Sequence, residues 1–357
     1  MDDARTLLTR ANARELLTAF KLDRMECLRP LVEFLARFPA RRLSRHILWF
    51  DHIAGQHGLA AAGRYMLNEF TSTTHIEGQQ HVPRHGPLLV VANHPGMVDA
   101  MAIWVALECR RDLKIIAAER DILRLIPNVR SRLLFVNPRA ECRVGLVRQA
   151  AGHLRQGGAL LTFPSGTIEP DPSVRPARPF LSWSSSADLL VRLVPETKVL
   201  PIVVSGVISI TALQHPLAKR FSEPKEREWA AATLQVFCRY FRDTQTRVAI
   251  GQPIPAGQFP LRPALDAAMT SLLNRVPPRN SSLRGESPAY PNFSLGTGVG
   301  DRGTRRESTI EKPVAFGSFG RLAPNFHPIF SALAASTTWP SPRRSRRPRV
   351  RSDLLRR

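Results

Sequence analysis

Cysteines, long apolar runs and acidic residues are all scarce in this sequence. Its four cysteines, among 357 residues, are widely spaced and form neither a disulfide-like nor a zinc-ligand pattern, which indicates a reducing compartment. The longest apolar stretch, residues 87–107, is interrupted by Asn93, His94 and Asp99, so we expect no membrane-spanning helix. The first residues lack the apolar core of a signal peptide. These shortages predict a cytoplasmic protein that is soluble or associates with membranes only peripherally.

The shortage of acidic residues leaves a strong positive charge. Lysine and arginine number 51, aspartate and glutamate 29, and the formal net charge is +22. Fifteen basic and five acidic residues lie from residue 278 onward, so this segment carries +10 and the preceding residues carry +12. Because the segment is rich in Pro, Ser, Gly and Arg and has no apolar periodicity, we predict a disordered tail over residues 278–357. Its charge would suit phospholipid headgroups or nucleic acid, although the tail could equally be inert.

The residues before the tail predict a helical segment, 1–72, followed by an α/β domain, 73–277. In the helical segment Leu43, Ile47 and Phe50 recur at helical spacing beside arginines. Such a helix can lie on an anionic bilayer, but packing against the next domain is the favoured interpretation. In the domain, strands alternate with helices, which predicts a mixed sheet flanked by helices. Strands are expected near residues 88–92, 113–117, 132–137, 159–163, 199–204 and 247–250, and helices near 99–109, 141–156 and 225–242.

The first candidate site follows the strand expected near residues 88–92. This apolar run ends in a loop that presents His94, and Asp99 comes five residues later. An imidazole can take a proton from an alcohol at neutral pH, and a carboxylate on its other nitrogen fixes the tautomer and stabilises the charge that forms. The pair is therefore predicted to act as a general base and its orienting carboxylate.

The spacing H-x4-D is weak evidence without its context. Ten histidines and thirteen aspartates in this chain give roughly 0.4 matches by chance. A second match, His46 and Asp51, lies in a helical pattern with no preceding strand, and we interpret this histidine as solvated rather than catalytic. His94 differs because α/β folds place ligands at the carboxyl ends of their strands.

Four segments together resemble the sequence blocks of the glycerolipid acyltransferases, the group that contains lysophosphatidate acyltransferase. They are N-H-P-G-M-V-D at residues 93–99, L-L-F-V-N-P-R at 133–139, F-P-S-G-T at 163–167 and V-L-P-I-V at 199–203. The resemblance implies an O-acyltransferase that moves a fatty acyl group from acyl-CoA or acyl carrier protein to a lysophospholipid or glycerol phosphate, without a bound cofactor.

This sequence departs from the family pattern in two places. Ser165 stands where the family usually carries a glutamate, and Glu169, four residues on, is a possible substitute. Arg139 follows Asn-Pro, one residue later than the family tends to place its arginine. Both departures concern the acceptor more than the chemistry.

Acyl transfer from a thioester needs a base, donors for the developing oxyanion and cations for anionic substrates. The backbone amides of Ser165, Gly166 and Thr167 are the predicted oxyanion donors, because glycine allows a close approach to a ligand. Arg139 is the first candidate for binding phosphate, helped by two further arginines of a proline-rich loop. Asn93 is a further predicted substrate contact. The two further arginines of the proline-rich loop are Arg175 and Arg178.

Alternative interpretations remain at this stage. Ser165 could be a nucleophile, but G-x-S-x-G is missing and turn chemistry explains the serine equally well. Arg139 could be an ordinary solvated arginine. The chain has no H-E-x-x-H or paired C-x-x-C motif, so no metal site is predicted. The competing function is an acyltransferase-like protein that has lost activity and binds anionic membranes or, less favoured, nucleic acid.

Overall fold

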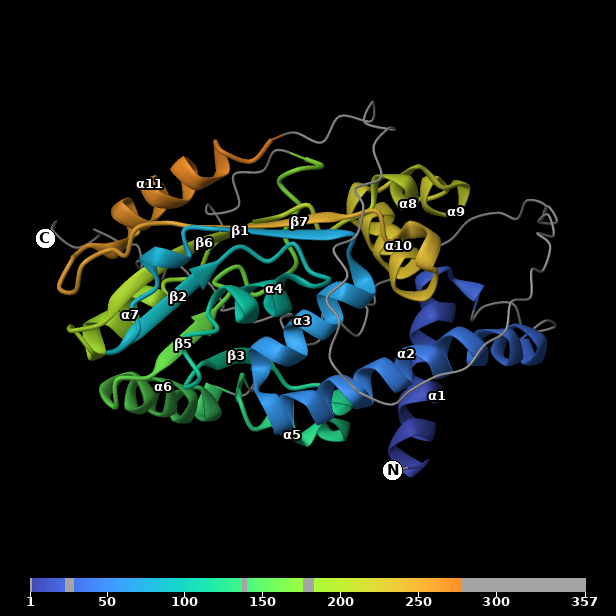
Figure 1. Ribbon diagram of the computed structural model, residues 1–357, viewed down its shortest axis with the longest axis horizontal. Helices are drawn as coiled ribbons and strands as arrows, with labels where there is room; N and C mark the ends of the chain where they lie inside the picture. The colour runs from blue at the N-terminus through green and yellow to red at the C-terminus, as the bar shows by residue number, and fades with distance from the viewer. Residues whose placement is uncertain (1, 23–28, 137–139, 176–182, 278–357) are drawn as a thin grey trace, which may run out of the picture. The chain divides into compact units, whose positions relative to one another are not determined.

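The computed structural model describes residues 2–22, 29–136, 140–175 and 183–277. The described residues before the first strand form three helices, α1, α2 and α3. Helices α1 and α2 pack against each other partly through polar side chains: the fully buried amide of Asn12 donates to Ser44 Oγ at 2.9 Å. Helix α3 then leads into the first strand (Figure 1). The bounds of these helices are α1 Asp2–Ala19, α2 Arg29–His57 and α3 Leu59–Phe70. The predicted tail, residues 278–357, lies outside the described residues.

Seven strands of the described chain form one mixed sheet in the order β1-β7-β6-β2-β5-β3-β4. β7 pairs antiparallel with β6 and parallel with β1, whereas the other pairs are parallel. The strands are β1 Thr73–Glu77, β2 Leu88–Ala92, β3 Lys114–Ala118, β4 Leu133–Val136, β5 Ala159–Thr162, β6 Lys198–Ser205 and β7 Gln245–Ile250. The predicted mixed sheet is confirmed with its six expected strands, and β1 is an addition that the sequence analysis missed.

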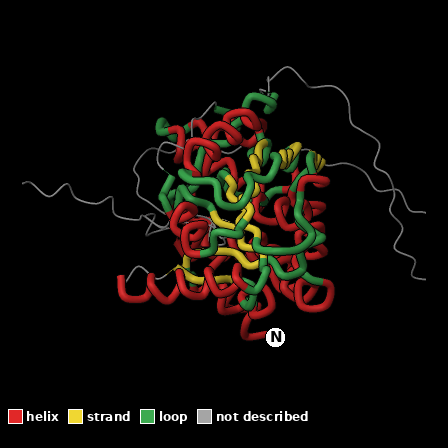
Figure 2. Tube along the Cα trace, turned by 90° about the vertical axis from the view of Figure 1, so that its left-hand side faces the viewer, coloured by secondary structure: helices red, strands yellow, loops and turns green. Residues whose placement is uncertain are grey.

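Helices cover both faces of the sheet, so the strands lie between two helical layers (Figure 2). Along β2, Leu88, Val90 and Ala92 join a core formed with α3, α4 and α10, whereas Leu89 and Val91 join one formed with α6, α7 and α11. The remaining helices are α4 Asp99–Ala106, α5 Pro127–Arg130, α6 Ala140–Arg155, α7 Ser186–Leu193, α8 Ile210–Gln214, α9 Pro216–Lys219, α10 Pro224–Phe237 and α11 Leu261–Leu273. Of these, α4, α6 and α10 correspond to the three predicted helices, whereas α5, α7, α8, α9 and α11 were not predicted.

The apolar stripe of α2 faces the protein core. Leu43, Ile47 and Phe50 are 3%, 4% and 2% exposed, and the Phe50 ring stacks on Trp104 of α4 with 5.8 Å between centroids. Packing against the following domain, the favoured interpretation, is therefore confirmed, and insertion of this particular face into a bilayer is wrong. Within the described residues no helix is both long and apolar enough to cross a membrane.

Candidate active site

The candidate active site lies at the carboxyl end of β2. This strand runs between β5 and β6, and all five of its side chains are fully buried. Burial on both faces explains why its sequence is an uninterrupted apolar run. The chain leaves the strand at Asn93 and His94, at the edge of the sheet where α/β proteins bind ligands.

Asn93 ties this loop to the neighbouring strand β6. Its Oδ1 accepts from the Val204 N–H at 2.7 Å, and its Nδ2 donates to the Val204 carbonyl at 2.9 Å. The side chain is fully buried. Because both ends of the amide are engaged by the protein, we interpret Asn93 as an anchor of the loop, and its role as a substrate contact stays a prediction.

His94 and Asp99 form the predicted pair. His94 Nδ1 lies 2.6 Å from Asp99 Oδ2, and the two side chains are 0% and 1% exposed. An ionised carboxylate only accepts hydrogen bonds, so in the neutral imidazole Nδ1 carries the proton and Nε2 is left as an acceptor. The same carboxylate accepts from the N–H groups of Gly96 at 2.9 Å and Ala100 at 2.6 Å, which fixes it at the first turn of α4.

The loop between the two residues turns tightly. Gly96 has a φ of 85°, and Met97 has a φ of 56°, a region that side chains other than glycine rarely adopt. A Cβ built on Gly96 would come within 3.3 Å of the Ile168 side chain. This turn brings Asp99 back under the imidazole, and unusual backbone of this kind is often found at functional sites.

The imidazole nitrogen opposite Asp99 is buried without a partner. His94 Nε2 forms no hydrogen bond to any part of the chain that the structure describes. The ring lies against Phe163, with 4.6 Å between centroids and an interplanar angle of 35°. A buried acceptor of this kind is uncommon in folded proteins, and here it is the atom on which a general base would receive a proton.

Glu169 is a site residue whose role sequence reasoning did not identify. Its carboxylate accepts from the His94 N–H at 2.8 Å and from Trp183 Nε1 at 2.8 Å, and its own N–H donates to the His94 carbonyl at 2.7 Å. Burial raises the pKa of Glu169 to about 7, while the bonds from Trp183 and His94 oppose the rise. In the sequence, only the position of Glu169, four residues after Ser165, indicated a role in the site. Nothing in the sequence indicated a role for Trp183.

The F-P-S-G-T turn is held by hydrogen bonds of its own. The Gly166 N–H donates to the Phe163 carbonyl at 3.1 Å, and the Thr167 N–H faces Ser165 Oγ at 3.4 Å. The Ser165 hydroxyl in turn donates to the Thr167 carbonyl at 2.7 Å. Two of the three predicted oxyanion amides are therefore engaged within the turn, and turn chemistry accounts for the serine.

The predicted phosphate-binding arginines are only partly covered by the structure. Arg139 and Arg178 lie outside the described residues. Arg175 pairs with Glu228 of α10, with 3.1 Å between guanidinium and carboxylate. Its charge is thus already balanced, so it is a weaker candidate for binding phosphate than the sequence analysis expected.

The second H-x4-D match does not form a pair. His46 Nδ1 lies 2.7 Å from the Tyr65 hydroxyl, and burial lowers the pKa of this half-buried histidine. Asp51 accepts instead from the Val129 N–H and the Asn128 side chain, each at 2.9 Å. The match is therefore structural, although His46 is not simply solvated.

The comparisons with known proteins agree with the sequence blocks. Residues 73–205 match the model of the Acyltransferase family, which shows that the chain carries an acyltransferase-family domain, as its resemblance to the glycerolipid acyltransferases predicted. Similar solved structures include the 1-acyl-sn-glycerophosphate (LPA) acyltransferase PlsC from Thermotoga maritima. That chain is 17% identical, the alignment covers 74% of this chain and 98% of the other, and the TM-score is 0.40, too distant to assign a substrate. The curated proteins give no match.

Proposed function

We propose that the protein is an O-acyltransferase that moves a fatty acyl group from the thioester of acyl-CoA or acyl carrier protein to a hydroxyl of a lysophospholipid or glycerol phosphate. The observation that carries the proposal is the buried His94, whose Nδ1–H is held by Asp99 while Nε2 is left as an acceptor without a partner. The family match of residues 73–205 supports the reaction class.

In the proposed reaction His94 Nε2 takes the proton of the acceptor hydroxyl as its oxygen attacks the thioester carbonyl carbon. Asp99 stabilises the imidazolium that forms. When the tetrahedral intermediate collapses, the C–S bond breaks and the thiolate leaves with the proton from His94, giving an ester and a free thiol. Arg139 remains the proposed partner of the acceptor phosphate.

The test is release of free thiol from acyl-CoA in the presence of lysophosphatidate. His94→Ala should lower the rate at least roughly 10²-fold, the usual contribution of a general base. His46→Ala is the matched control, because it removes the histidine of the other H-x4-D match, and it should leave the rate nearly unchanged. Near-normal turnover of folded His94→Ala protein would refute the mechanism.

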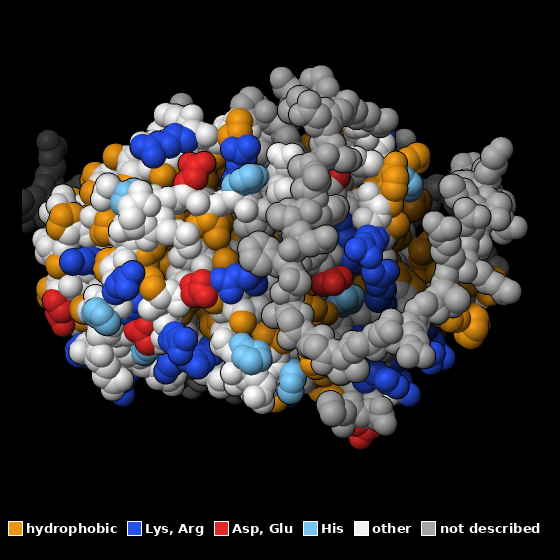
Figure 3. Space-filling view, viewed as in Figure 1, with side chains coloured by type: hydrophobic (Ala, Val, Ile, Leu, Met, Phe, Trp, Pro, Cys, Tyr) orange, Lys and Arg blue, Asp and Glu red, His pale blue; other side chains and the backbone are white. Residues whose placement is uncertain are grey.

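The proposal also includes peripheral docking on the cytoplasmic face of an anionic membrane. The exposed face of α2 supports it: Leu31, Phe34, Leu35 and Phe38 are each between 55% and 60% exposed, and exposed arginines continue the same helical face. Shallow insertion of apolar side chains and attraction of arginines to anionic headgroups act together at membrane surfaces. On the face drawn in Figure 3, basic side chains clearly outnumber acidic ones.

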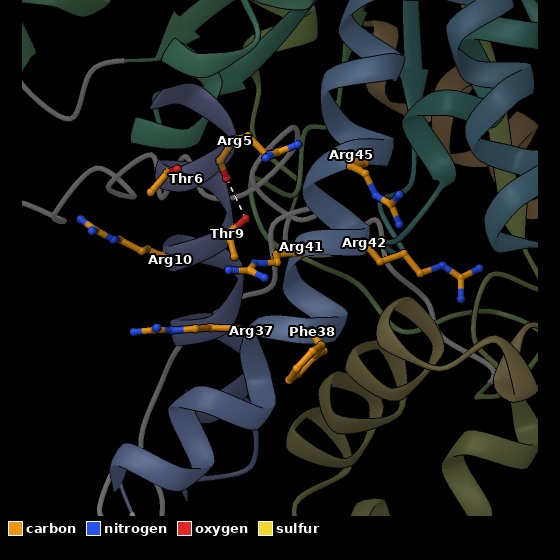
Figure 4. A pocket seen from close by; sticks show the side chains of 9 residues that line it. All are labelled: Arg5, Thr6, Thr9, Arg10, Arg37, Phe38, Arg41, Arg42 and Arg45. Atoms are coloured by element: carbon orange, nitrogen blue, oxygen red, sulfur yellow. Dashed lines mark hydrogen bonds between the residues drawn. The ribbon is translucent and has the colours of Figure 1, made fainter. Parts of the chain in front are cut away.

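A basic pocket of about 600 Å³ lies where α1 meets this face of α2. Arg41 lies between the two helices near Thr9, while Arg10 and Arg37 extend to one side and Arg45 to the other (Figure 4). No carboxylate is among its described lining residues, which would suit the phosphates of anionic lipids. The pocket is lined by Arg5, Thr6, Thr9, Arg10, Arg37, Phe38, Arg41, Arg42 and Arg45.

Co-sedimentation with vesicles of phosphatidylcholine, with and without phosphatidylglycerol, tests this docking. Binding should require the anionic lipid and weaken with salt, since the screening length falls from about 10 Å at 0.1 M to about 3 Å at 1 M. Replacing Arg41 and Arg45 by glutamate should weaken binding more than Arg192→Glu, a control on α7 at the other face of the sheet. Equal binding to neutral vesicles would refute electrostatic docking, and intact binding without thiol release would favour the inactive alternative.

A further inference from the structure

Glu169 contacts both peptide groups of His94. One carboxylate oxygen accepts from the His94 N–H at 2.8 Å, and the Glu169 N–H donates to the His94 carbonyl at 2.7 Å. The other carboxylate oxygen accepts from the indole N–H of Trp183 at 2.8 Å. Glu169 is 6% exposed, so this set of contacts is shielded from water. The acid–base chemistry described above uses none of them.

Together with the bonds of Asp99 and Asn93, these contacts hold the backbone and the ring of His94 in place. Asp99 sets the rotation of the imidazole through Nδ1, and Asn93 ties the preceding residue to β6. Glu169 follows β5, the other neighbour of β2, so the base is held from both sides of its own strand. A misplacement of about 1 Å at a reacting group can lower a rate about 10²-fold.

The carboxylate is directed at the protein rather than at a substrate. Both of its oxygens accept bonds from buried neutral donors, and within the described residues its hydrogen-bond partners include no lysine or arginine. Glu169 is therefore not a substrate contact. It does not take over the role of the glutamate that the family usually carries at the position of Ser165. In its ionised form Glu169 places a negative charge beside His94, where it favours the protonated imidazole that forms during proton abstraction.

We propose that Glu169 is a positioning residue for His94, which places the base by clamping its peptide groups, with Trp183 orienting the carboxylate. The proposal rests on the proposed role of His94 in acyl transfer.

The chemistry of glutamine supplies a sharp test. Glutamine has one acceptor oxygen and one NH₂ group, so in Glu169→Gln the His94 N–H and the Trp183 N–H compete for a single acceptor. We expect kcat to fall about tenfold or more and the KM for lysophosphatidate to change little, because the carboxylate does not touch substrate. Trp183→Phe removes the competing donor, so the double variant should recover most of the lost kcat.

Two results would overturn the proposal: wild-type kcat in Glu169→Gln, or a double variant no better than the single one. Glu15→Gln is the matched control, because Glu15 is another carboxyl whose pKa burial raises to about 7, on α1 rather than at the site. Thermal unfolding of each variant identifies those that fold.

Hydrogen exchange of the His94 backbone amide, followed by NMR, gives a readout that does not depend on catalysis. In Glu169→Gln the His94 N–H shares its acceptor with Trp183, so this amide should exchange faster, whereas Glu15→Gln should leave its exchange rate unchanged. If the exchange rate rises while thiol release is insensitive to His94→Ala, the clamp stands and the proposed function fails. Unchanged exchange in a folded Glu169→Gln protein would refute the clamp.

Discussion

Asp99→Asn should remove the proposed base function of His94 while preserving the shape of the site. The Asp99 carboxylate accepts three hydrogen bonds, from His94 Nδ1–H, Gly96 N–H and Ala100 N–H, at 2.6, 2.9 and 2.6 Å. Asparagine has one acceptor oxygen, so its NH₂ must take the place either of Oδ2, where it faces His94 and Gly96, or of Oδ1, where it faces Ala100. If it faces His94, the ring must accept at Nδ1 and carry its proton on Nε2, where it can no longer act as a base.

The other orientation keeps the tautomer but loses the negative charge and sets the NH₂ against the Ala100 N–H. A hydrogen bond to a charged group contributes about 1.5–3 kcal/mol, so we expect the free energy of unfolding to fall by about 2–4 kcal/mol. In either orientation kcat should fall at least roughly 10²-fold, since the imidazolium loses its counter-charge. Urea unfolding measures the first quantity and thiol release the second.

Asp51→Asn is the matched control for this prediction. Asp51 belongs to the other H-x4-D match, is 6% exposed and likewise accepts bonds from a backbone N–H and a side chain. Its replacement should destabilise the protein without changing kcat of the folded molecules. The reasoning is refuted if Asp99→Asn keeps near-normal kcat, or if the two variants lose activity equally at equal stability.

Three further predictions follow from single side chains. Burial raises the pKa of Glu15 from 4.5 to about 7, so the stability that its neutral form provides at low pH is lost as the pH rises through this range. Glu15→Gln should therefore increase the free energy of unfolding at pH 8 by about 1–3 kcal/mol and change it little at pH 4. Asn93→Ala leaves the N–H and carbonyl of Val204 buried without these partners and should reduce the unfolding free energy, measured in urea, by about 2–4 kcal/mol. Arg139→Ala should chiefly raise the KM for lysophosphatidate, with partial rescue by Arg139→Lys; an unchanged KM would exclude its proposed phosphate contact.

The parts of the site that could be predicted from sequence are those made by local contacts. His94 and Asp99 are five residues apart, between a buried strand and the helix that follows, so their meeting depends only on one tight turn. The strand itself was predictable because burial on both faces requires an apolar run. β1 shows the opposite case: at the edge of the sheet, Thr73–Glu77 is half-buried or exposed and carries no such run.

The other contacts join residues that are far apart in the chain. Glu169 lies 75 residues from His94, and Val204 lies 111 residues from Asn93. Both contacts depend on β2 lying between β5 and β6, and strand order cannot be read from apolar periodicity. A polar residue beside His94, the proposed base, therefore looks like a substrate contact in the sequence, whereas in the fold Asn93 holds the neighbouring strand.

The hydrogen bonds of His94 explain why one nitrogen is available for chemistry. Its N–H and carbonyl are bound by Glu169, and its Nδ1–H is bound by Asp99, so Nε2 is the one polar atom of the residue left without a partner in the described structure. A buried acceptor without a donor costs about 1–3 kcal/mol, and the bonds to Asp99 and Glu169 offset this cost in the folded protein. A substrate hydroxyl that donates to Nε2 would remove the same cost. The hydrogen bond that favours binding of this hydroxyl is therefore also the one along which the proposed proton transfer to His94 takes place.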